Sequence, residues 1–378
     1  MSVALQKTLS LILLIILGLF LKRKFTTADQ NKGIKTIILD IALPAMIFVA
    51  LLKIEINPDL LILPILALVF NILMLLFTRY AMLVFGIESN TATMRTLMLL
   101  IPSLAPGLTC FPFIVEYLGD DVLAWAALSD MGNKVFVLIA AYMLAMSWFY
   151  KNHRLKSRSN TQKVKELLVS MIKEPINMVI ISAIILLGIG VNLESMPVFV
   201  SDAILMMKNM MTPLVLLFIG IAVVFKWQQL RMITALLVFR AGFVFILSGL
   251  FVLLVPLPNE AAVLLAVVFP QSAVSFWPFA HMSAVRSLEL KNKDLEKKPT
   301  FDLELGINIL AVSMPFSTLL VLGIFTSDSY FTNPYHVLLF GAIMLSMAVV
   351  PKVIQWLKST DIGLDSLNEK QLDDSTVE

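Results

Sequence analysis

The stretch 97-LMLLIPSLAPGLTCFPFIVEYLGDD-121 decides how this chain folds. It is apolar enough to enter a bilayer, yet Pro102, Pro106, Gly107 and Pro112 interrupt it. An interior proline removes a backbone donor and clashes with the preceding turn, so we expect a broken helix here. Broken backbone persists inside hydrocarbon only where it is buried in protein or lines a cavity. The stretch therefore predicts a discontinuous helix with a role beyond packing.

A second interrupted apolar stretch, 261-AAVLLAVVFPQSAVSFWPFAHMSA-284, contains Pro270 and Pro278. The two stretches share a local pattern, Thr-Cys-Phe-Pro-Phe at 109–113 and Ser-Phe-Trp-Pro-Phe at 275–279. Paired broken segments in corresponding halves of a chain indicate the binding site of a transporter. The alternative is that proline and glycine, which are frequent in membrane helices, only kink the two segments.

The composition identifies the class of protein. Of 378 residues, 59% are hydrophobic and 15% are charged, whereas soluble domains have about 25% charged residues. The chain is therefore expected to be an integral membrane protein embedded in a lipid bilayer. Its net charge of +3 argues against a nucleic-acid partner. The single cysteine and three scattered histidines form no metal-ligand spacing, so we expect no metal and no cofactor.

No catalytic motif stands out in the apolar segments, so we do not expect an enzyme. A GxxxxGK[ST] phosphate-binding loop is also missing from the sequence, which argues against an ATP-driven pump.

Apolar runs of about 20 residues, the length that spans a bilayer, recur along the chain. The first half, residues 1–150, holds five runs, near 3–21, 34–52, 60–85, 97–117 and 122–149. A basic linker, 151–174, separates it from a second half, 175–326, with runs near 175–193, 198–225, 232–255, 261–284 and 303–325. An additional C-terminal transmembrane helix is predicted within 327–358, followed by a polar tail at 359–378 that is expected to be disordered.

Five helices per half would make the second half run opposite to the first. The patterns Asp40-x-x-x-Pro44 and Asn209-x-x-x-Pro213 lie at matching places in the second and seventh runs. We therefore predict an all-α membrane protein with about 10 transmembrane helices in an inverted 5+5 repeat, plus the extra helix. Lys and Arg gather in alternate connections, which predicts an extracellular N-terminus and a cytoplasmic C-terminus in the cell membrane.

Three motifs carry a family resemblance. The opening ILLIILGLFLKRKFTTADQNKGIKTIILDIALPAMIF has a Gly before a basic turn and then Leu-Pro-Ala-x-x-Phe; FPQSAVSFWPFAH and Met314-Pro315 follow later. In these motifs residues 8–326 resemble the auxin efflux carrier family, which includes PIN-formed carriers and bacterial malate-type permeases. The resemblance implies two crossing broken helices beside a substrate pocket, a moving bundle of runs three to five and eight to ten, and a scaffold of runs one, two, six and seven.

Three positions depart from the family's pattern. Ala105 stands where an Asn is usual, Cys110 where a Gly is usual, and Ser275 where a Pro is usual. These departures leave the identity of the substrate open.

The broken helices supply the predicted substrate-binding residues. Half-helix N-termini attract carboxylates, and uncharged donors beside them suit a small organic anion better than a cation. The predicted contacts are Pro106, Gly107, Thr109, Cys110, Pro112, Pro270, Gln271, Ser272, Ser275 and Pro278, with Gln271 as the principal polar contact. For any single hydroxyl the alternative is a hydrogen bond to its own helix.

Three titratable residues are candidates for coupling. Asp130 and Lys134 lie one helical turn apart, a spacing that favours an ion pair. The pair either neutralises its two charges inside the protein or is broken when substrate or a proton binds. His281 is a proton-linked group or a structural histidine.

These features favour a secondary active transporter or permease that moves a malate- or auxin-like carboxylate by alternating access. A proton or sodium coupling ion and a homodimer are left open. The rival interpretation is a channel or a membrane-embedded sensor with the same fold.

Overall fold

The computed structural model describes residues 3–25, 27–53, 58–154, 165–166, 169, 172–173, 175–222, 227–290 and 298–349. These residues form helices joined by turns, and the one β-type pairing among them is an antiparallel bridge between Ala105 and Ala273. Six of the helices are long and apolar enough to cross a membrane. The chain is thus all-helical and fits an integral membrane protein.

The first half contains nine helices among its described residues, and their lengths follow the apolar runs. They are α1 (Val3–Leu21), α2 (Ala28–Ile37), α3 (Leu43–Lys53), α4 (Ile62–Val84), α5 (Ala92–Leu100), α6 (Pro106–Thr109), α7 (Phe111–Leu118), α8 (Asp120–Lys134) and α9 (Ala141–Asn152). A π-helical turn at Ile38–Ala42 joins α2 to α3, and another at Val135–Ala140 joins α8 to α9. Each of these pairs therefore forms one continuous span.

The second half follows the same order of long and broken helices. It contains α11 (Pro175–Gly188), α12 (Val198–Ala222), α13 (Trp227–Leu254), α14 (Glu260–Val268), α15 (Phe276–Glu289) and α17 (Leu303–Thr326). A 3₁₀ turn, Phe269–Gln271, follows α14, and a last apolar helix covers Pro334–Val349. Pro213 and Pro315 lie inside α12 and α17 without ending them.

Both broken segments are longer than the hydrophobic pattern predicts. The first begins at Ala92 rather than at 97, because the Thr91 hydroxyl accepts a hydrogen bond from the Met94 N–H and caps α5. The second continues through the polar end of α15 to Glu289. Hydrophobicity alone does not detect these ends, because they lie beyond the apolar residues.

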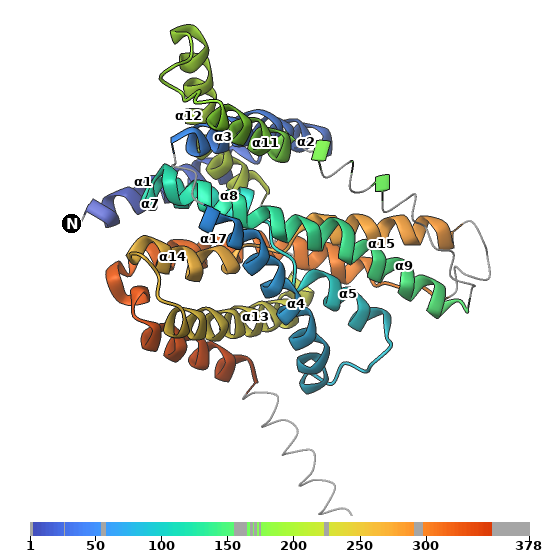
Figure 1. Ribbon diagram of the computed structural model, residues 1–378. Helices are drawn as coiled ribbons and strands as arrows, with labels where there is room; N and C mark the ends of the chain where they lie inside the picture. Colours follow the sequence, from blue (N-terminus) through green and yellow to red (C-terminus); the bar gives the residue numbers. More distant parts are fainter. Residues whose placement is uncertain are drawn as a thin grey trace, which may run out of the picture.

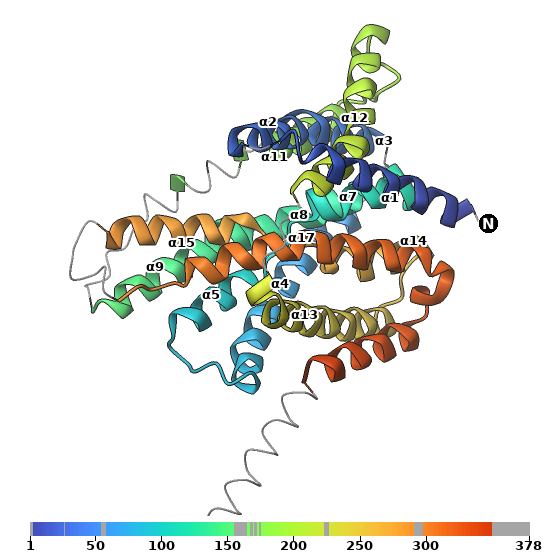
Figure 2. The ribbon, with the colours of Figure 1, turned by 180° about the vertical axis from the view of Figure 1, so that it is seen from behind.

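The helices form two groups (Figures 1 and 2). In one group, α1 packs on α12, α11 packs on α3, and α12 packs on α3. Gly18 and Gly220 allow the contact between α1 and α12, because a Cβ on either glycine would collide with the backbone of the other helix. The second group contains α4, α5, α6, α7, α8, α9, α13, α14, α15 and α17. We call the first group the α1/α3/α11/α12 group and the second the crossing group.

The C-terminal helix Pro334–Val349 lies against α13 (Figure 1), where Gly242 and Gly341 make the close approach. Residues 350–358 of the predicted last helix and the predicted tail at 359–378 lie outside the described residues. So does most of the predicted linker, at 155–164, 167–168, 170–171 and 174.

Candidate functional site

The two broken helices cross and touch through their backbones. The Ala105 N–H donates to the Ala273 carbonyl at 2.8 Å. The Ala273 N–H donates to Thr109 Oγ1 at 3.1 Å, and the Ser275 N–H donates to Ser103 Oγ at 2.9 Å. Segments that lie about 170 residues apart in sequence therefore share one hydrogen-bonded crossing, which we call the crossing.

The breaks lie between α5 and α6 and between the 3₁₀ turn and α15. Pro106 opens α6, and Cys110 separates α6 from α7, so the first segment is interrupted twice. The patterns at 109–113 and 275–279 are consequently not equivalent in space. The pattern at 275–279 begins just after Ala273 of the bridge. In the first segment, helix α6 lies between Ala105 of the bridge and most of the pattern at 109–113.

Two buried asparagines satisfy the backbone of the first break. Asn133, on α8, accepts from the Leu104 N–H at 3.2 Å and donates to the Leu104 carbonyl at 2.9 Å. Asn71, on α4, donates to the Pro102 carbonyl at 2.7 Å. An unpaired backbone group in hydrocarbon costs several kcal/mol, so these amides stabilise the break inside the protein.

A buried arginine also holds this break. Arg240, on α13, is 2% exposed, and its Nε donates to the Ile101 carbonyl at 2.9 Å. Its Nη2 lies 3.4 Å from the Ser103 carbonyl. No carboxylate among the described residues forms an ion pair with this guanidinium. Among the described residues, the partners of this buried cation at the crossing are backbone carbonyls.

The three predicted hydroxyl contacts are buried at the crossing and bonded to protein. Thr109 Oγ1 donates to the Ala105 carbonyl, and Ser272 Oγ donates to the Phe269 carbonyl. Ser275 Oγ accepts from the Trp277 N–H and so caps α15. Each hydroxyl thus forms a hydrogen bond within its own segment, as expected for a single Ser or Thr, and Thr109 also accepts the hydrogen bond from Ala273 across the crossing.

Gln271 is fully buried, and its donor group is already engaged. Its Nε2 donates to the Ala241 carbonyl of α13 at 3.1 Å, while its Oε1 has no partner among the described residues. An unpaired amide oxygen accepts a hydrogen bond and does not attract a carboxylate. The direct anion contact assigned to Gln271 therefore stays a prediction, and Arg240 has the more suitable charge.

The remaining predicted contacts lie along the same two segments. Pro106, Cys110, Pro112 and Pro278 are buried, and Pro270 and Gly107 are half-buried. A Cβ on Gly107 would lie 2.9 Å from Leu43 Cδ2, so this glycine lets α6 approach α3 of the other group. Their role as substrate contacts stays a prediction.

Asp130 and Lys134 lie close to each other on α8. Their charged groups are 3.6 Å apart, and both residues are buried. Asp130 also accepts from Asn133 at 2.8 Å, and Lys134 Nζ donates to Asn177 of α11 at 3.2 Å. The pair therefore connects the crossing to the α1/α3/α11/α12 group.

His281 contacts the π-helical turn in the middle of the fifth span. Its Nε2 lies 2.9 Å from the Val137 carbonyl, and its ring packs edge-on against Tyr142. This hydrogen bond agrees with the structural alternative for the histidine.

Sequence reasoning did not select Asn71, Asn133 or Arg240 as site residues. Their signal in the sequence was a strongly polar side chain inside an apolar run, which is rare because burying such a group in a membrane is costly. What the sequence did not show was that all three side chains bond to one break.

A cavity of about 340 Å³ lies where α7 of the broken segment faces α1, α3 and α12. Its polar lining comes from Ser10, Glu116, Lys208, Asn209 and Thr212. The described residues contain no cluster of three or more His, Cys, Asp or Glu side chains that could hold a metal.

Comparison with known proteins gives no assignment, because no family model and no curated protein matches the chain.

Proposed function

We propose that this chain is a secondary transporter of the auxin efflux carrier type, which moves a small organic anion by alternating access. The observation that carries the proposal is the contact of Ala105 with Ala273, where two broken helices cross inside an apolar helical protein. Interrupted helices with buried backbone groups typically form the binding site of transporters.

The packing supports an inverted 5+5 repeat. In such a repeat a contact recurs with the roles of the two halves exchanged, and several of the contacts do so, although that of α3 with α8 has no equal counterpart between α12 and α17. The contact of α1 with α12 matches that of α11 with α3, and α4 with α5 matches α13 with α14. The contact of α4 with α8 likewise matches that of α13 with α17.

The charges near the crossing favour an anion. Asp130 and Lys134 neutralise each other, which leaves the positive charge of Arg240 in excess. The 340 Å³ cavity, whose lining does not include Arg240, offers Lys208, Asn209 and Thr212 as donors beside Glu116. Lys208 is paired there with Asp120, so the excess positive charge comes from Arg240. The volume of the cavity is at the lower end of the range of about 300–1,000 Å³ for small-molecule sites, which suits a mono- or dicarboxylate.

In this proposal the crossing group moves against the α1/α3/α11/α12 group, and the bound anion is exposed to each side in turn. The crossing supplies fixed dipoles and the Arg240 charge, so the site need not reorganise when the anion arrives. A proton or sodium ion remains the candidate for coupling.

Uptake into proteoliposomes tests the proposal. Vesicles containing the purified chain are given a panel of labelled mono- and dicarboxylates under imposed pH, sodium or voltage gradients. A carrier should show saturable uptake and counterflow. Flux without saturation or counterflow would instead indicate the channel alternative, and no flux of any anion would contradict the transport proposal.

The role of Arg240 has a test of its own. Losing a hydrogen bond to a charged ligand costs about 1.5–3 kcal/mol, so Arg240→Gln should weaken anion affinity roughly 10- to 150-fold. Arg240→Lys keeps the charge and should lose less. Arg231→Gln, at an exposed position of the same helix, is the matched control. Equal anion affinity in Arg240→Gln and in the control would exclude Arg240 from the site.

A further inference from the structure

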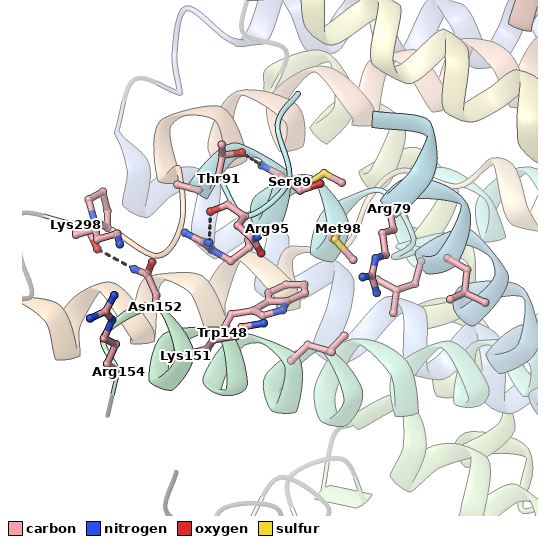
Figure 3. A pocket seen from close by; sticks show the side chains of 17 residues that line it. Arg79, Ser89, Thr91, Arg95, Met98, Trp148, Lys151, Asn152, Arg154 and Lys298 are labelled. Atoms are coloured by element: carbon pink, nitrogen blue, oxygen red, sulfur yellow. Dashed lines mark hydrogen bonds between the residues drawn. The ribbon is translucent and has the colours of Figure 1, made fainter. Parts of the chain in front are cut away.

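A second and larger cavity lies away from the crossing (Figure 3). It has a volume of about 790 Å³ and lies between the C-terminal part of α4, the start of α5, the end of α9 and residues 298–299. The proposed transport does not use this cavity. Because α4 and α9 both end beside it, it lies at the level where membrane-spanning helices leave the hydrocarbon.

The lining of this cavity is strongly basic. Arg79, Arg95, Lys151, Arg154 and Lys298 line it, and no Asp or Glu is among the described residues that do so. Figure 3 shows Arg79 on one side and Arg154 and Lys298 on the other, with Trp148 and Met98 between them. Glu289 interacts electrostatically with Arg95 but does not line the cavity. Like charges brought together repel one another, so the basic lining is suited to an anion.

Most of these cations are free to bind a ligand. Arg95 is engaged, since its Nε donates to the Thr300 carbonyl at 2.7 Å and its Nη1 to the Asn90 carbonyl at 2.6 Å. The charged groups of Arg79, Lys151 and Arg154 have no ion-pair partner among the described residues. These three side chains are exposed at the mouth of the cavity.

The inner wall of the same cavity is apolar. The wall consists of Leu75, Leu76, Met98, Leu144 and Trp148, and Met98 and Trp148 lie between the basic residues of the two sides (Figure 3). Leu76 is 50% exposed and continues the outward face of α4, where Ile72 and Leu73 are also exposed. In a membrane this face of α4 contacts lipid, so the apolar wall is continuous with the acyl-chain region of the bilayer.

We propose that this cavity binds an anionic phospholipid. The anionic headgroup lies in the basic cavity, attracted by Arg79 from one side and by Lys151 and Arg154 from the other, and an acyl chain lies along Leu76 and the outward face of α4. Basic pockets between membrane helices suit anionic headgroups, and the apolar wall favours a lipid over a soluble phosphate. The site is separate from the crossing, so it does not depend on the transported substrate.

Lipid binding to the purified full chain tests this proposal. The wild type in detergent is titrated with dioleoyl phosphatidylglycerol, dioleoyl phosphatidylcholine, the short-chain dihexanoyl phosphatidylglycerol and glycerol 3-phosphate. Bound lipid is counted by native mass spectrometry, and the melting temperature is followed in parallel. We expect tight binding of dioleoyl phosphatidylglycerol, weaker binding of the short-chain form, and little binding of phosphatidylcholine or glycerol 3-phosphate.

Two triple variants with the same change in charge locate the site. Arg79→Gln, Lys151→Gln and Arg154→Gln remove the basic mouth, and each Lys or Arg near an anionic lipid contributes about 1 kcal/mol, so affinity should fall roughly 100-fold. The control carries Arg23→Gln, Lys24→Gln and Lys32→Gln, at exposed positions outside the cavity. It should keep wild-type affinity.

Three results would overturn the proposal. One is equal binding of phosphatidylglycerol and phosphatidylcholine by the wild type. This comparison needs no variant, so misfolding of a variant cannot affect it. Another is glycerol 3-phosphate binding as tightly as the lipid, which would make the cavity a soluble-phosphate site. The third is an equal loss in both triple variants, which would indicate attraction by net charge alone.

Discussion

At the scale of single residues, three polar side chains hold the broken backbone of the crossing. Asn71, Asn133 and Arg240 come from α4, α8 and α13 and bond to carbonyls at 101–104. A buried polar group costs free energy unless it is hydrogen-bonded, so each side chain and each freed carbonyl satisfies the other. The interruption of the helix is therefore a stable part of the fold.

The ion pair on α8 allows a first test at this scale. Lys134→Ala leaves the buried Asp130 carboxylate without its cation, and removing one partner of a buried pair costs about 3–5 kcal/mol. The double change Asp130→Asn with Lys134→Gln removes both charges and should cost less. Melting in one detergent compares the two variants, and equal destabilisation would show that the charges do not act as a pair.

At the scale of elements, close backbone contacts fix how the helices pack. Gly132, on α8, lies against the Pro64 carbonyl of α4, and an added Cβ would collide with that backbone. The contact brings Asn71 and Asn133 within hydrogen-bond distance, 3.2 Å, from their two helices. The packing of α4 on α8 thus positions the amides that support the crossing.

A glycine substitution tests this packing. Gly132→Ala should force the two helices apart and destabilise the protein by about 1–3 kcal/mol, the usual cost of overpacking. Gly33→Ala, on α2, has nothing within 4 Å of the new methyl and should be neutral or slightly stabilising. Melting temperatures of both variants are compared with wild type. A Gly132→Ala variant as stable as wild type would contradict the close contact.

A buried carboxylate joins three elements at the far end of α15. Glu289 accepts from the Thr300 N–H at 2.8 Å, from Arg286 at 3.2 Å, and is hydrogen-bonded to His153 at 3.1 Å. Burial alone would raise its pKa, but the hydrogen bonds from Thr300, His153 and Arg286 together hold the pKa below its ordinary value. The residue lies beyond the apolar part of α15, outside the predicted membrane segment.

This shift gives a pH dependence with a definite sign. Because the folded pKa of Glu289 is lowered, its contribution to stability is present above the ordinary value of 4.5 and is lost as pH falls through the lower folded value. Glu289→Gln should melt at a lower temperature than wild type at pH 7, and the difference should shrink below pH 4.5. Glu304→Gln, at an exposed position, serves as control.

At the scale of the whole molecule, one carboxylate joins the two helix groups. Asp120, at the start of α8, pairs with Lys208 of α12 at 2.7 Å and with Lys53 of α3 at 2.7 Å. Both lysines belong to the α1/α3/α11/α12 group, whereas α8 belongs to the crossing group. Lys208 also lines the 340 Å³ cavity, so movement of one group against the other would break these pairs beside the proposed substrate.

A double-mutant cycle measures this connection. Asp120→Asn, Lys208→Gln and the double variant should show a coupling of about 1 kcal/mol, since the pair is only partly exposed. The same cycle with Asp121→Asn, whose residue is exposed and has no ion pair with Lys208, should show none. Stability is measured by melting in one detergent. Additive effects of the two substitutions in the Asp120 cycle would show that Asp120 and Lys208 do not stabilise the contact between the two helix groups.

Part of this organisation follows from the sequence alone. Apolar length predicts the spans, and the prolines at 102–112 and 270–278 predict where the helices break. Both properties are local, because helix formation in a membrane depends on the residues of the segment itself. The spacing of Asp130 and Lys134 predicts their pairing for the same reason.

The tertiary structure alone decides what each break contacts. The Gln271 amide N–H bonds to the Ala241 carbonyl of another helix, and the side chains of Asn133 and Arg240 support the first break from positions distant in sequence. The substrate contact predicted for Gln271 stays a prediction. A broken helix frees carbonyl and N–H groups whose partners come from whichever helix packs nearby. That choice depends on contacts between residues far apart in sequence, such as Gly132 with Pro64, and no local pattern encodes it.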